Sequence, residues 1–375
     1  MIRIDEIYNH TLWPWLQRNR PGVRLFFCDP PGRTDPDALF NLGNDDIVET
    51  NYIFCHDQEP VHMDEFRRLF DEVADRNKDM WWPVEQKTPP PYPNNLGHVI
   101  VSERGEYVEA LCKKYHWKSH YYFYHGWACQ DWFRGYDKAF LIDRARDRTP
   151  TRTFMSPNRI VAGKRDHRVL FLYNVFKQGL EHNHISAPRT CPVENVDITS
   201  IAQKYTNVYQ DITNVFERAD LPRTFAGEAT QEMTSCWLGN FTEAADSLVY
   251  VPTETVYFGR RIHLTEKTFK AIALEMPFVL VAPNGSLAYM REYGFKTFDT
   301  VFDESYDLET DDIRRVEKVT ALLKHLDSLT LAQRLEIHNQ CLPIVEYNYN
   351  HFYNGGLTDI LWKELNAMLA GINNV

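Results

Sequence analysis

The sequence of 375 residues lacks the features that mark several large classes of protein. No apolar run approaches the roughly 20 residues that a membrane-spanning helix needs. The N-terminus, MIRIDEIYNHTLWPWLQRNR, carries acids early and has no apolar segment, so we expect no signal peptide or anchor. Neither a GxxxxGKS/T loop nor a GxGxxG motif after a strand is present, which argues against P-loop and dinucleotide-binding enzymes. These absences favour a soluble cytoplasmic protein.

Cysteine pairs and excess positive charge are also missing. The seven cysteines are odd in number, scattered and never spaced as CxxC, so we expect reduced thiols and no structural metal site. The 41 Lys and Arg residues are outnumbered by 52 Asp and Glu, which gives a formal net charge of −11. That charge disfavours generic binding to nucleic acid or anionic lipid, so any nucleic-acid contact would be local.

Apolar and aromatic residues are abundant, and the chain is long enough for two domains. Strand-like runs alternate with helix-like runs, which predicts an α/β fold with mostly parallel sheets. A charged stretch at Asp143–Thr151 marks the expected boundary between domains 1–146 and 147–375. In the first domain we expect strands at 23–28, 47–55 and 98–102 and helices at 64–75 and 105–115; the chain should end in helices at 314–328, 331–348 and 357–369.

The stretch Arg260–Asn284 is the most informative part of the sequence. Just before it, Ser247–Pro252 is an apolar run that predicts a buried strand followed by a polar loop. Thr265 is placed to cap a helix whose apolar residues recur at helical spacing until Pro277 ends it. Phe278–Ala282 is uniformly apolar, as expected of a parallel strand covered on both faces.

Cations gather at the start of this helix, at Arg260, Arg261, His263 and Lys267. In open α/β sheets, ligands bind beyond the carboxyl ends of strands, where a helix N-terminus supplies free N–H groups. A lysine in the first turn opposes the helix dipole by up to about 1 kcal/mol, which a bound phosphate would offset. The alternative is that these cations are solvated or paired with surface acids.

A second helix start repeats the pattern. Thr151–Ser156 predicts a strand, Pro157–Arg165 a loop and Asp166–Leu180 a strongly apolar helix that Asp166 can cap. The cationic residues at the entry to this helix are Arg159, Lys164, Arg165, His167 and Arg168. Two such helix starts facing one crevice would clamp a pyrophosphate, although each charge taken alone could be an ordinary exposed one.

The sequence HLTEKTF at His263–Phe269, followed by an apolar strand, resembles the donor-binding motif of glycosyltransferase family 10, the α-1,3-fucosyltransferases. His263 stands where the family usually has Tyr, whereas Thr265, Glu266 and Lys267 match. The resemblance implies that Glu266 binds the nucleotide ribose and Lys267 a phosphate. The upstream segment from FMSPNR through DHRVLF also resembles the family and implies that Arg168 binds the diphosphate. The likeness covers roughly the second half of the chain.

The family resemblance implies a GT-B architecture, with two Rossmann-like domains whose parallel sheets face a central cleft and with C-terminal helices. The first domain would hold a hydroxyl acceptor and the second a GDP- or UDP-sugar, with fucose a candidate sugar. No metal or other cofactor is then required, because Arg168, Lys267 and helix dipoles stabilise the departing diphosphate. CHDQEP at Cys55–Pro60 is similar to the family's acidic motif, so Glu59, with Asp57 in reserve, is the candidate base for inverting transfer. The alternative is a surface carboxylate before a turn proline.

The sequence departs from the family just before the donor motif. VPTET at Val251–Thr255 replaces an aromatic-acidic-Asn element, so Glu254 is only a weak counterpart and the nucleotide base is left open. The anchor and disulfides of eukaryotic members are missing, which points to a bacterial or viral enzyme in the bacterial or host cytoplasm.

Three alternatives remain beside this interpretation. A phage enzyme that glycosylates DNA bases could contact a duplex through the basic stretch at Arg144–Lys164. A virion or glycan-binding protein could keep the fold without the catalytic base. A metal-dependent GT-A enzyme would need an Asp-x-Asp motif, which Asp35-Pro36-Asp37 supplies formally within a turn-rich loop.

Overall fold

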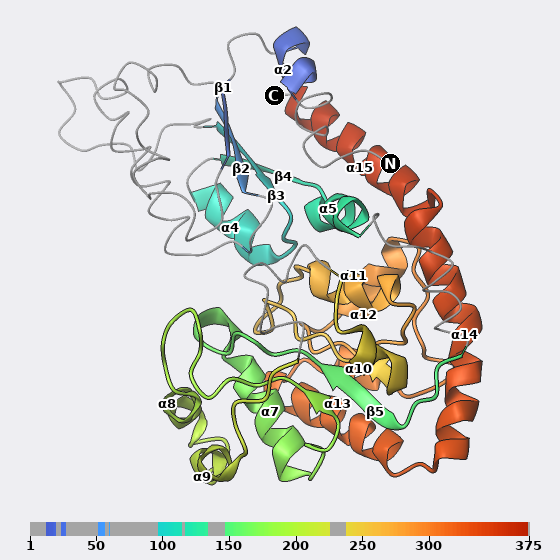
Figure 1. The fold of residues 1–375 in the computed structure, drawn as a ribbon. Helices are drawn as coiled ribbons and strands as arrows, with labels where there is room; N and C mark the ends of the chain where they lie inside the picture. Colours follow the sequence, from blue (N-terminus) through green and yellow to red (C-terminus); the bar gives the residue numbers. More distant parts are fainter. Residues whose placement is uncertain are drawn as a thin grey trace, which may run out of the picture. The chain divides into compact units, whose positions relative to one another are not determined.

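The computed structural model describes residues 13–19, 24–27, 52–56, 60, 97–114, 117–133, 147–225 and 238–373. Contacts divide the chain into two compact units, Met1–Asp131 with Asp359–Val375, and Trp132–Thr358. Each unit holds a parallel sheet, so the mixed α/β class expected from the sequence is confirmed (Figure 1). Most of the last helix is grouped with the first unit, whereas the expected division placed residues 147–375 together.

The first unit is built on a four-stranded parallel sheet in the order β1-β2-β3-β4. Its strands are β1 (Arg24–Phe27), β2 (Tyr52–His56), β3 (Gly97–Val101) and β4 (Trp117–Tyr121), and its described helices before the chain end are α2 (Trp13–Asn19), α4 (Glu106–Lys114) and α5 (Tyr124–Trp132). The strands expected at 23–28 and 98–102 are present, as is the helix expected at 105–115. The helix expected at 64–75 lies outside the described residues.

The end of the chain completes the first unit. Within α15 (Gly356–Asn373), the carboxylate of Glu364 accepts a hydrogen bond from the backbone N–H of Phe123 at 2.5 Å and lies 3.5 Å from the guanidinium of Arg104. Trp362 meets Trp127 of α5 edge to face, with ring centroids 4.8 Å apart. These contacts attach α15 to the loop that follows β3 and to the loop and helix that follow β4.

The second unit contains the sheet β6-β5-β7, from β5 (Arg152–Ser156), β6 (His184–Ile185) and β7 (Ser247–Tyr250). Where a strand was expected at Phe278–Ala282, the structure forms two isolated parallel bridges, Tyr250 with Phe278 and Thr253 with Val281, beside the end of β7. The N–H of Val279 donates to the carbonyl of Tyr250 at 3.0 Å, and that of Glu254 to the carbonyl of Val281 at 2.9 Å. All four residues of β7 are buried, as the apolar run predicted.

Helices surround this second sheet. They are η2 (Gly163–Arg165), α7 (His167–Lys177), α8 (Ile198–Ala202), η3 (Gln203–Tyr205), α9 (Ile212–Arg218), α10 (Phe241–Asp246), α11 (Glu266–Ala273), α12 (Ser286–Glu292), η4 (Ser305–Leu308), α13 (Asp312–Asp327) and α14 (Leu331–Tyr353). Helices α7 and α13 pack on each other, and α13 also contacts β5 (Figure 1). The three terminal helices expected from the sequence are present. No helix in the described part of the chain combines the length and low polarity that crossing a bilayer requires.

Helix α11 begins and ends for local reasons. The hydroxyl of Thr265 accepts from the N–H of Lys267, so Thr265 is the N-cap that the sequence predicted. At the other end, the buried guanidinium of Arg148 donates to the carbonyls of Leu274 and Glu275 at 3.1 and 2.9 Å, which satisfies groups that a helix end leaves open. The helix ends at Ala273, before the sequence reaches Pro277, and Glu275 turns the chain with φ of 51°.

Candidate functional site

The candidate site lies at the carboxyl ends of β5 and β7. From β5 the chain passes to β6 on one side of it, and then to β7 on the other side. The strand order therefore reverses between β5 and β7. Loops between parallel strands and their helices diverge at such a point, which makes it the usual ligand site of an open α/β sheet. Here the diverging segments are 157–166, before α7, and 251–265, before α11.

Short polar side chains close the strand ends beneath these loops. The amide of Asn158 accepts from the hydroxyl of Thr253 at 2.8 Å and donates to the carbonyl of Ser156 at 3.1 Å. The backbone N–H of Asn158 donates to the hydroxyl of Ser186 at 2.7 Å. All four residues are buried, so the network satisfies polar groups that water does not reach.

Arg168 joins the two diverging loops. Its guanidinium donates to the carbonyl of Ile160 at 2.7 Å on one side and to that of Thr253 at 2.7 Å on the other. The residue is 3% exposed, and burial, followed by the nearby Arg165, lowers its pKa to about 9, while Glu254 and Glu266 act in the opposite direction. The guanidinium is therefore charged at neutral pH and held by backbone oxygens. Arg168 is the residue for which the sequence predicted binding of a diphosphate.

Glu254 lies under the start of α11. Its carboxylate accepts from the N–H and the hydroxyl of Thr265, at 3.2 and 2.7 Å, and from the hydroxyl of Thr268 at 2.6 Å. The side chain is fully buried. A carboxylate at a helix N-terminus is stabilised by the dipole and by charge-assisted hydrogen bonds. Glu254 and Arg168 thus form opposite charges on either side of one segment, with the backbone of Thr253 and Glu254 between them.

Lys267 is the cation of α11 that reaches the surface of the site. Its ammonium donates to the hydroxyls of Thr265 and Thr255, at 3.0 and 3.2 Å, and to the carboxylate of Glu266 at 2.8 Å. The side chain of Lys267 is 23% exposed, twice the 11% of Glu266. Two hydroxyls and one carboxylate fix the ammonium beside the helix N-terminus, which gives a solvent-reachable positive charge of defined position.

Stacked side chains hold the loop at 251–265 in place. The ring of His167, the first residue of α7, stacks on that of Tyr257, with centroids 4.8 Å apart and an interplanar angle of 7°. The guanidinium of Arg315 also lies over the Tyr257 ring, 4.3 Å from its centroid. Arg315 also donates to the carbonyl of Tyr257 at 3.0 Å, and the Tyr257 hydroxyl donates to the carbonyl of Asp312 at 2.7 Å. Complete burial, then the charge of Arg168, lowers the pKa of His167 well below its usual value.

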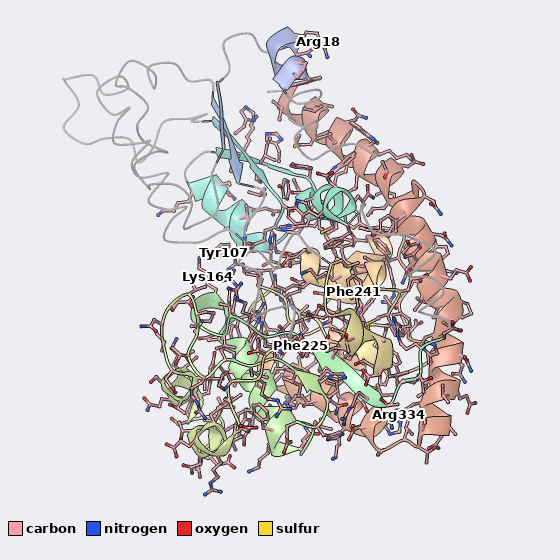
Figure 2. The ribbon with its side chains drawn as sticks, viewed as in Figure 1. Arg18, Tyr107, Lys164, Phe225, Phe241 and Arg334 are labelled. Carbon is pink, nitrogen blue, oxygen red and sulfur yellow. The ribbon has the colours of Figure 1, made fainter. Side chains whose placement is uncertain are left out.

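The remaining predicted cations differ in exposure. His263 is fully buried, Arg159, Arg165 and Arg261 are half-buried, and Lys164 and Arg260 are exposed. Lys164 lies beyond the carboxyl end of β5, at the opposite side of the second unit from Arg334, which binds the amino end of the same strand through the carbonyl of Thr151 (Figure 2). The exposed charges therefore belong to the loop edge of the sheet.

The predicted donor residues thus separate into a connected cluster and a rim. Hydrogen bonds link Arg168, Glu254, Thr265, Glu266 and Lys267, and the rim carries the other cations. Sequence reasoning missed Asn158, Thr253, Tyr257 and Arg315. A usable signal existed for Asn158 and Thr253, because each follows an apolar strand directly, but nothing in the local sequence indicated the distant partner of Arg315.

The two predicted catalytic carboxylates, Asp57 and Glu59, lie outside the described residues. Within the ranges that the structure describes, no three His, Cys, Asp or Glu side chains are grouped so as to hold a metal ion.

Chemically, the cluster offers a fixed ammonium, a helix N-terminus and polar backbone at one edge of a parallel sheet, which are the groups that bind a phosphorylated ligand. The chain matches none of the family models, curated proteins or solved structures with which it was compared.

Proposed function

We propose that the protein is a glycosyltransferase of GT-B type, which moves a sugar from a nucleoside diphosphate to a hydroxyl acceptor. The second unit would bind the GDP- or UDP-sugar and the first unit the acceptor. The observation that supports this proposal is the cluster at the carboxyl ends of β5 and β7, where the starts of α7 and α11 are joined through Arg168 and Glu254. A diphosphate needs positive charge and N–H donors, and both occur there.

The proposed reaction is an inverting displacement. The acceptor oxygen attacks the anomeric carbon while the bond from that carbon to the diphosphate oxygen breaks, and the hydroxyl proton passes to a carboxylate. Glu59, or Asp57, would receive this proton, as the motif around them suggests. The nucleoside diphosphate leaves with an additional negative charge, which Lys267 and the N-terminus of α11 would stabilise.

The geometry changes the role proposed for Arg168. Because its guanidinium already holds two backbone carbonyls, we assign it a positioning role in which it fixes the loop of Thr253 against α7. Its positive charge still contributes to the field of the site, since no carboxylate pairs with it directly in the described residues. Lys267 is then the residue that would touch the phosphate.

A thermal-shift panel of GDP-, UDP-, CMP- and dTDP-sugars tests this assignment. One nucleotide should raise the melting temperature of the wild-type protein, because a ligand at 100 times its Kd stabilises the folded state by about 2.7 kcal/mol. Lys267→Ala should abolish that rise. The matched control is Lys324→Ala, which removes another surface ammonium that binds the carbonyl of Gln178 at the far end of α7. A flat panel, or an undiminished rise in Lys267→Ala, would contradict the proposal.

A further inference from the structure

Phe258 is an exposed aromatic ring on an otherwise buried loop. Residues 251–257 are all buried, whereas Phe258 is 36% exposed. Gly259, with φ of 78°, turns the chain immediately after it, and the exposed Arg260 follows. Isolated apolar residues on a surface are common, so exposure alone carries no function. The position of this ring at the loop edge of the second sheet is what distinguishes it.

The ring is held by rigid neighbours. Phe258 lies perpendicular to Tyr257, with centroids 5.4 Å apart, and perpendicular to His167, with centroids 6.0 Å apart. Tyr257 is itself fixed through its carbonyl by Arg315 and through its hydroxyl by Asp312. Thr253, five residues earlier, is fixed by Arg168. An aromatic surface that is anchored in this way binds a planar ligand without first losing much conformational freedom.

The ring also lies at the start of α7, one of the two helix starts that meet in the proposed site. His167 is the first residue of α7 and precedes Arg168, so contact with His167 places Phe258 at the helix start. Arg260, two residues further along, is exposed and cationic. A nucleotide carries a planar base and charged phosphates on one ribose, which suits an aromatic face next to cations and helix N-termini. Phenylalanine has no polar group for sugar hydroxyls, whereas every nucleobase has a π-face.

We propose that Phe258 is the stacking platform for the nucleobase of the donor nucleotide. This inference rests on the proposed function and adds the residue that binds the base. Stacking on a phenyl ring depends little on base identity, so Phe258 would supply affinity and other groups would supply the choice between bases.

Equilibrium binding of GDP, UDP and inorganic pyrophosphate to wild type and Phe258→Ala tests the platform. We expect the variant to raise the Kd of the nucleoside diphosphate that binds wild type by roughly tenfold, and to leave the Kd of pyrophosphate within about twofold. Phe258→Trp should retain nucleotide binding. The matched control is Tyr347→Ala, an exposed aromatic of the same unit that packs on His351 and Lys296.

The outcomes separate the two proposals. If wild type binds a nucleoside diphosphate and Phe258→Ala binds it equally well, the platform is wrong and the proposed function stands. Equal losses for nucleotide and pyrophosphate, in a variant of unchanged melting temperature, would place Phe258 at the phosphates and overturn the inference. A loss confined to the intact nucleotide sugar would assign the ring to the sugar and also overturn it. If wild type binds neither GDP nor UDP, the proposed function itself fails for these donors.

Discussion

The guanidinium of Arg168 donates to the carbonyl oxygen of Thr253 at 2.7 Å, and so joins two segments that are 85 residues apart in the chain. The same guanidinium holds the carbonyl of Ile160. Both bonds have a charged donor, and the bond to Thr253 is buried, a setting in which charge-assisted hydrogen bonds contribute most. The arrangement of the loop edge depends on this one side chain.

Arg168→Ala should therefore lower the free energy of unfolding by about 3 kcal/mol, because it leaves the buried carbonyl of Thr253 and the partly buried carbonyl of Ile160 without their donor. For a unit of this size, each kcal/mol corresponds to about 2–4 °C of melting temperature, so calorimetry should detect a fall of roughly 6–12 °C. Lys164→Ala, which removes an exposed cation nearby, should change stability by less than about 0.5 kcal/mol. A melting temperature of Arg168→Ala within about 2 °C of wild type, which corresponds to about 1 kcal/mol or less, would refute the linking role.

Glu254→Gln should also destabilise the second unit. The substitution keeps the shape of the side chain but removes the negative charge that meets the N-terminus of α11 and opposes Arg168 across the loop. We expect a loss of about 1–3 kcal/mol in urea-induced unfolding. Glu217→Gln, on the exposed surface of α9, is the matched control and should behave as wild type. Equal stability of the two variants would show that the buried charge has no structural role.

His167 should make stability fall on acidification. Its folded-state pKa lies well below the usual value of about 6.5, so below that pH the unfolded chain takes up a proton that the folded protein refuses. The contribution is fully present above pH 6.5 and declines by up to about 1.4 kcal/mol for each pH unit below it. Urea unfolding of wild type and His167→Phe at pH 7.5, 6 and 5 isolates this effect, since phenylalanine keeps a ring against Tyr257 but does not titrate.

The difference in free energy of unfolding between wild type and His167→Phe isolates His167. Burial also lowers the pKa of His120, in the first unit, to about 4, so His120 destabilises both proteins on acidification. That effect is common to both proteins and cancels in their difference. Parallel stability curves for wild type and His167→Phe between pH 6.5 and 5 would contradict the assignment.

Glu59→Gln should keep nucleotide binding and lose sugar transfer. An amide cannot accept the acceptor's proton, and a general base contributes about 10²–10⁴-fold to rate. Release of nucleoside diphosphate in the presence of an acceptor measures transfer, and the thermal shift measures binding. Normal turnover by Glu59→Gln, together with failure of Asp57→Asn, would move the role to Asp57.

The local elements of the second unit were predictable because their causes are local. Apolar runs and a capping threonine predicted the order of strand, loop, helix and strand around α11. The structure confirms the strand, the loop and the capped helix, whereas the last run forms two isolated parallel bridges. The helix predicted at Asp166–Leu180 is present as His167–Lys177. The side chain of Asp166 does not cap it, because the carboxylate pairs with Lys204 instead.

The sequence could not show which groups each charged side chain would contact in the folded protein. Arg168 was expected to bind a diphosphate, and the sequence did not indicate that its guanidinium also binds a backbone oxygen from a segment 85 residues away. Glu254 looked like a weak counterpart of a family motif, and its carboxylate proves to be buried under the Thr265 cap. Both outcomes depend on tertiary proximity, which periodicity and capping rules do not encode.

The network of Asn158, Ser156, Ser186 and Thr253 is composed only of neutral hydroxyl and amide groups. The side chains that join these strand ends are therefore dipoles rather than ions, and the charged side chains belong to the loops and helix starts that follow. Substitutions at Arg260, Phe258 or Lys267 would then alter binding at the proposed site, while the hydrogen bonds among the strand ends stay in place.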